Sequence, residues 1–178
     1  MNLPNKLSVT RALLIPVMVV LMYFDNRACS ILAAAVFGAA AYTDYLDGHI
    51  ARKQGLVTDF GKFIDPVADK LLNLSAMFML ARSGLLPHWL VIVILARELC
   101  VDGLRMVAVG QGKVIAAGWL GKVKTTSQIV LVLWLLLTRL PVSGNFLSLL
   151  IAAWVLFITL WSGVDYFMKN KDCVKNVK

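Results

Sequence analysis

Four aspartates are the residues most able to do chemistry: Asp44, Asp47, Asp65 and Asp69. They lie where two apolar runs, 31–42 and 63–81, follow each other in the sequence, and an aspartate costs roughly 2.5–3.5 kcal/mol near the centre of a membrane helix. On helices the first pair, three residues apart, and the second pair, four apart, would each share a face. Four converging carboxylates cannot all stay ionised unaided, and divalent cations remove the conflict. Oxygen ligands favour Mg²⁺, Mn²⁺ or Ca²⁺. Four of them suit two ions about 3.5–4 Å apart, an arrangement used for phosphoryl transfer.

Small residues accompany both aspartate pairs. Gly48 and Ala51 share the face of Asp44, and Gly61 precedes Asp65 by one helical turn. They leave room beside the metals for a planar or phosphate-bearing ligand, and Arg52 could reach a phosphate. A purely structural interpretation is that small residues permit close helix packing and that the carboxylates form ordinary ion pairs. The cost of four aspartates in lipid favours the functional interpretation.

Six apolar runs must position these residues. The chain has 178 residues, of which 60% are hydrophobic and 16% charged, more apolar than a soluble domain of this size. The runs are 12–24, 31–42, 63–81, 90–109, 129–140 and 146–166. They lack the alternation of barrel strands, and helices satisfy their own backbone hydrogen bonds in lipid. We therefore expect one domain, residues 1–178, with an all-α integral membrane fold of six transmembrane helices. Residues 1–10 are expected to form a short interfacial helix, and the fifth helix to begin near Thr125.

The net charge is +8. The expected membrane topology explains the distribution of the basic residues better than a nucleic-acid site does. Basic residues of loops and termini divide eleven to three between the two sides of a six-span arrangement. The positive-inside rule then places both termini, and the aspartates, at the cytoplasmic face of the cell membrane. The basic C-terminal tail suits anionic membrane lipid. Three widely spaced cysteines indicate neither a disulfide framework nor a metal site.

Residues 44–69 read DYLDGHIARKQGLVTDFGKFIDPVAD. This resembles the signature of the CDP-alcohol phosphotransferase family, with every spacing kept. The signature residues here are Asp44, Asp47, Gly48, Ala51, Arg52, Gly61, Asp65 and Asp69. The resemblance implies an enzyme with two divalent ions, Mg²⁺ or Mn²⁺, held by the four aspartates, with Asp69 also the general base. It implies that the CDP-linked donor lies against Asp47, Gly48, Ala51, Arg52 and Gly61, that CMP leaves, and that the chain is a homodimer.

The rest of the chain resembles bacterial family members that use glycerol 3-phosphate. Similar stretches include the start NLPNKLSVTRALLIP, the segment FIDPVADKLL, Ala96 to Glu98, and Gly121 to Thr125. The implied reaction moves the phosphatidyl group of CDP-diacylglycerol to glycerol 3-phosphate, giving phosphatidylglycerophosphate and CMP.

A small dianionic acceptor needs cations. Arg97 and Arg105 lie eight residues apart on the fourth predicted helix, roughly 80° around it, so they can face one pocket. Lys122 and Lys124 stand at the start of the fifth. We expect these four to bind the acceptor phosphate. The structural alternatives are pairing of Arg105 with Asp102 or Glu98, and a positive-inside loop for the lysines. Glu98 could orient an arginine or bind the glycerol hydroxyls.

Two further functions are open. The same chemistry could use inositol phosphate, serine or phosphatidylglycerol as acceptor. A cation transporter could use the acidic cluster for transit, but transporters favour broken helices and inverted repeats, and this chain has no internal repeat.

Overall fold

Six α-helices form the described part of the chain. The computed structural model describes residues 3–54, 59–112, 115 and 118–171, with side chains described over 10–43, 67–112, 115 and 118–171. No strand occurs among these residues. The helices are α1 Leu3–Tyr23, α2 Arg27–Gln54, α3 Asp59–Arg82, α4 His88–Gly110, α5 Trp119–Thr138 and α6 Phe146–Lys169. The all-α prediction is confirmed.

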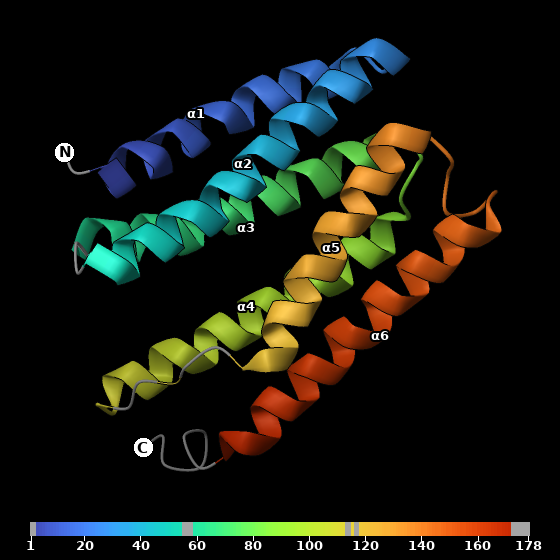
Figure 1. Ribbon diagram of the computed structural model, residues 1–178. Helices are drawn as coiled ribbons and strands as arrows, with labels where there is room; N and C mark the ends of the chain where they lie inside the picture. The colour runs from blue at the N-terminus through green and yellow to red at the C-terminus, as the bar shows by residue number, and fades with distance from the viewer. Residues whose placement is uncertain (1–2, 55–58, 113–114, 116–117, 172–178) are drawn as a thin grey trace.

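The helices run in alternating directions, so the start of α1 and the end of α6 lie at the same end of the bundle (Figure 1). α1 packs against α2 and α3, and α5 packs against α2, α3 and α6. α4 contacts α3 and α6. Phe37 of α2, Met77 of α3 and Leu135 of α5 are fully buried in one apolar core. α5 therefore joins the N-terminal and C-terminal helices.

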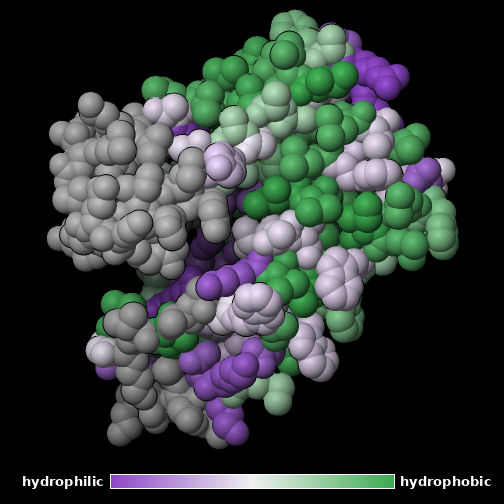
Figure 2. Space-filling view, in the orientation of Figure 1, coloured by the Kyte–Doolittle hydropathy of each residue, from purple (hydrophilic) through white to green (hydrophobic). Residues whose placement is uncertain are grey.

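The outer surface is strongly apolar. Leu150, Trp154 and Trp161 of α6 are each about half exposed, and hydrophobic side chains cover much of the visible face in Figure 2. α5 and α6 are long and apolar enough to cross a bilayer. Shorter apolar helical segments cover Thr10–Tyr23 and Arg27–Thr43. Among the described residues, two helices thus meet the criterion for a span.

Two predicted boundaries were wrong. The N-terminal residues form no separate interfacial helix, because α1 is continuous from Leu3 to Tyr23. Pro4 falls in its first turn, where the missing N–H is tolerated. α5 begins at Trp119, not near Thr125, with Gly118 in an extended conformation at the N-cap. Lys122 and Lys124 therefore stand on a helix rather than in a loop.

The end of the bundle where α1 meets α2 and α5 meets α6 is closely tied. Arg139, in the left-handed conformation at the end of α5, pairs with Asp25 and donates a 2.7 Å hydrogen bond from Nη1 to Ser30 Oγ. The amide of Val142 donates to the Leu85 carbonyl, 3.0 Å away, joining two turns. These contacts link the α1–α2, α3–α4 and α5–α6 connections.

Candidate active site

A cavity of about 580 Å³ lies between α3, α4, α5 and α6. Hydrophilic side chains are visible deep in the hollow between the upper and lower parts of the molecule (Figure 2). The cationic residues that line the cavity are Lys70, Arg97, Arg105, Lys122 and Lys124, and the carboxylates are Asp69, Glu98, Asp102 and Asp165. The structure thus places all four predicted acceptor residues on one cavity with Asp69.

Arg97 crosses from α4 to α6. Its Nη2 donates a 3.1 Å hydrogen bond to Ser162 Oγ, and its Nη1 lies 3.7 Å from Glu98 Oε1. A side chain at Gly163 would crowd it, because a Cβ there would stand 3.3 Å from the Arg97 Cγ. The absence of a side chain at Gly163 therefore provides the space through which the arginine passes.

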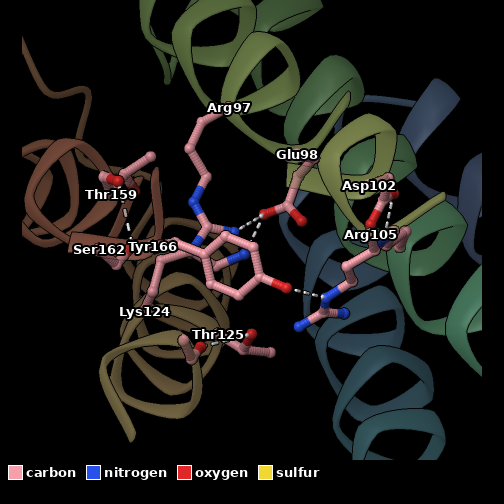
Figure 3. Close-up of polar contacts among 11 residues, drawn as sticks. Arg97, Glu98, Asp102, Arg105, Lys124, Thr125, Thr159, Ser162 and Tyr166 are labelled. Carbon is pink, nitrogen blue, oxygen red and sulfur yellow. Dashed lines mark hydrogen bonds and ion pairs between the residues drawn. The ribbon is translucent and has the colours of Figure 1, made fainter. Parts of the chain in front are cut away.

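Glu98 and Lys124 form a buried ion pair between α4 and α5. Figure 3 shows the Arg97 guanidinium and the Lys124 ammonium both directed at the Glu98 carboxylate. A buried charge is tolerated only when it is paired and hydrogen-bonded. Of the two roles left open for Glu98, the structure therefore favours orienting its cationic neighbours.

Arg105 is held by α6. Its Nε donates a 2.9 Å hydrogen bond to the Tyr166 hydroxyl, and its Cζ lies 5.4 Å from the centre of the Tyr166 ring. Asp102, one of the two intrahelical partners in the structural alternative for Arg105, pairs instead with Lys70 of α3. Within the described part of the chain, neither Arg105 nor Lys122 forms a salt bridge. Both are therefore able to receive an anion.

Among the four aspartates of the predicted metal site, Asp69 alone has a described side chain, and it lines the cavity. The side chains of Asp44, Asp47 and Asp65 lie outside the described residues, as do the donor-site positions Gly48, Ala51, Arg52 and Gly61. The described side chains contain no group of three His, Cys, Asp or Glu residues that could hold a metal. α2 continues to Gln54 and α3 begins at Asp59, so both aspartate pairs lie on uninterrupted helix. The argument from their spacing depends on this.

Sequence reasoning missed the polar residues of α6. Thr159, Ser162 and Tyr166 are buried at spacings of three and four residues on the most apolar helix. Ser162 and Tyr166 contact the two arginines (Figure 3). A signal was available, since polar residues at helical spacing inside a lipid-facing run mark a buried face.

A family model for CDP-alcohol phosphatidyltransferases matches residues 1–163. The chain belongs to this family. CDP-alcohol phosphatidyltransferases generally use divalent metal ions, and membership together with the two apolar helices makes this a membrane protein. Tyr166 lies beyond the part that the family model matches.

Individual members of the CDP-alcohol phosphatidyltransferase family are similar over almost the whole chain. A Bacillus subtilis protein named CDP-diacylglycerol–glycerol-3-phosphate 3-phosphatidyltransferase is 46% identical, covering 98% of this chain and 97% of its own. A Salmonella choleraesuis protein of that name is 38% identical, covering 93% and 92%. A Mycobacterium tuberculosis protein named as a probable phosphatidylglycerophosphate synthase is 39% identical, covering 93% and 79%.

Proposed function

We propose that this protein transfers the phosphatidyl group of CDP-diacylglycerol to glycerol 3-phosphate, giving phosphatidylglycerophosphate and CMP. The observation that carries the proposal is the cavity that joins Asp69 to Arg97, Arg105 and Lys122. The names of relatives that match nearly the full chain support the same donor and acceptor.

The acceptor phosphate is proposed to bind Arg105 and Lys122 first. Glycerol 3-phosphate is a dianion, and guanidinium groups offer it paired hydrogen bonds. Arg97 and Arg105 lie close enough for their like charges to repel, which an anion between them would relieve. Lys124 already pairs with Glu98, a carboxylate that it shares with Arg97. Its proposed role is to hold this carboxylate in place and to add positive charge near the acceptor phosphate.

Asp69 is proposed as the general base. It lines the same cavity as the arginines and interacts electrostatically with Lys124. An acceptor whose phosphate lies against Arg105 extends its hydroxyl within that cavity. Asp69 takes the hydroxyl proton as the oxygen bonds to the phosphatidyl phosphorus, and the bond from that phosphorus to the CMP oxygen breaks. The donor nucleotide is proposed to lie against Asp47, Gly48, Ala51, Arg52 and Gly61.

Two divalent ions, Mg²⁺ or Mn²⁺, are proposed to be held by Asp44, Asp47, Asp65 and Asp69. The donor set fits, because carboxylate oxygens are the ligands that these hard cations prefer. When bound, the ions would supply neutralisation of charge on the diphosphate.

The single domain, residues 1–178, is proposed to cross the cytoplasmic membrane six times, as a homodimer. The shared location of the start of α1 and the end of α6 supports an even number of crossings (Figure 1). The excess of basic residues near that end supports its cytoplasmic placement. The active site then faces the cytoplasm.

The decisive experiment measures CMP release by purified protein in detergent, with CDP-diacylglycerol, Mg²⁺ and one acceptor at a time. We expect release that requires glycerol 3-phosphate and stops with a chelator. Release only with inositol phosphate, serine or phosphatidylglycerol would keep the chemistry and refute the acceptor. No release with any acceptor, from protein shown to be folded, would refute the enzyme proposal.

A further inference from the structure

A second cavity, of about 640 Å³, lies between α5 and α6. Its lining residues are Trp119, Lys122, Val123, Thr126, Ser127, Val130, Leu150, Ile151 and Trp154. Apolar side chains predominate, and both helices are long enough to span a bilayer. The Trp154 Nε1 donates a 3.0 Å hydrogen bond to Ser127 Oγ across this groove, which occupies the polar atoms of both side chains. The α5–α6 groove is therefore an apolar channel on the lipid-facing side of the bundle.

The groove is continuous with the polar cavity. Lys122 and Thr126 line both. A ligand can thus place an anionic group at Lys122, in the cavity that Arg105 also lines, while an apolar chain extends from that point along α5 and α6. A ligand with one charged end and one long apolar chain matches this combination.

The length of the groove fits one leaflet of a bilayer. It runs along α5 from Trp119 to Val130, eleven residue steps, or about 16 Å at the helical rise. Half of the hydrocarbon core of a bilayer is about 15 Å. The charged end of the groove lies near one terminus of α5 and its apolar end near the middle of the helix, as for an acyl chain whose headgroup stays at the interface.

We infer that the α5–α6 groove binds an acyl chain of the phosphatidyl group. The inference rests on the proposed function, because it assigns a place to the lipid part of the donor. The phosphatidyl group carries its chains through the transfer, so one groove serves the donor and the product. Lys122 at the junction is the residue proposed to bind the acceptor phosphate, so in the product it contacts a phosphate of the same molecule whose chain lies in the groove.

Leu150 and Leu149 provide a matched pair for the test. Both are leucines of α6 and equally exposed, at 49% and 50%, but only Leu150 lines the groove. Leu150→Trp should fill the groove and raise the KM for long-chain CDP-diacylglycerol about tenfold, since each buried methylene contributes to binding. The KM for a dihexanoyl donor, too short to reach Leu150, should change less than about twofold. Leu149→Trp should leave both values unchanged.

A binding measurement separates this inference from the proposed function. CDP-diacylglycerol with a diazirine near the end of one chain would be photolysed with the wild-type protein, and the labelled peptides identified. We expect labels at Val130, Leu150 and Trp154, whether or not the protein releases CMP, and loss of these labels in Leu150→Trp. Labels confined to other helices would overturn the inference. The inference would also be overturned if Leu150→Trp and Leu149→Trp changed the KM values for both donors equally. The same holds if Leu150→Trp changed the oligomeric mass but not the dependence of KM on chain length.

Discussion

The hydroxyl of Tyr166 offers a sharp test of the acceptor site. Tyr166→Phe removes the oxygen that accepts the 2.9 Å hydrogen bond from Arg105 Nε and leaves the ring, 5.4 Å from the guanidinium carbon, in place. The side chain is only 8% exposed, so water replaces the lost partner poorly. Arg105 would then sample other positions in the cavity, and the acceptor would have to order it on binding.

The magnitude follows from the value of a hydrogen bond to a charged group. Such bonds contribute about 1.5–3 kcal/mol, and partial hydration of Arg105 from the cavity reduces the loss to about 1–2 kcal/mol. That corresponds to a rise of about five- to thirtyfold in the KM for glycerol 3-phosphate. The KM for CDP-diacylglycerol should stay unchanged, because the variant alters no group proposed to bind the donor.

The assay is CMP release at saturating donor with glycerol 3-phosphate varied. Tyr23→Phe is the matched control, since the Tyr23 ring also lies against an arginine, 4.2 Å from Arg82 Cζ, but at the opposite end of the bundle from the cavity. The effect of Tyr166→Phe should vanish in an Arg105→Ala background, which by itself should weaken use of the acceptor. An unchanged KM for glycerol 3-phosphate would refute the reasoning, as would equal rises in both KM values.

Three other variants test the remaining parts of the site. Asp69→Asn should lower kcat by about 10²–10⁴-fold while donor binding, measured by calorimetry, persists; wild-type turnover would remove the proposed base. Glu98→Gln should lower Tm strongly, since breaking a buried pair costs about 3–5 kcal/mol, whereas Asp102→Asn, in a more exposed pair, should lower it less. Gly163→Ala should displace Arg97 and raise the KM for glycerol 3-phosphate about twofold or more; Gly103→Ala, where an added Cβ meets no atom within 4 Å, should not.

Helical spacing was enough to bring the two arginines of α4 to one cavity. Their separation of eight residues follows from local geometry, which a sequence carries directly. The start of α5 was harder to predict from the sequence, because Gly121, Lys122 and Lys124 are residue types that are common in loops. They form helix here, and Lys124 pairs with Glu98 of α4, a partner 26 residues away that no local pattern reveals.

The contacts of α6 could not be predicted from the sequence for a related reason. Ser162 and Tyr166 bind arginines 65 and 61 residues earlier in the chain, and no local pattern specifies which helix faces which. For the motif from Asp44 to Asp65, the sequence is more informative than the structure. Its signature is the most specific feature of the sequence, whereas its side chains lie outside the described residues, so its metal-binding role stays a prediction.

The tied end of the bundle has a mechanical consequence. Arg139 and the Val142–Leu85 hydrogen bond hold three connections together there, whereas the pairs beside the cavity, such as Lys70 with Asp102, involve charges that a phosphate can compete for. A helix of 20 residues is about 30 Å long, so a rotation of about 5° at the tied end displaces the far end by about 3 Å. Small changes of angle at one end of the bundle are therefore amplified at the other. Any change of helix angle at the tied end would therefore change the width of the cavity near the opposite end of the bundle.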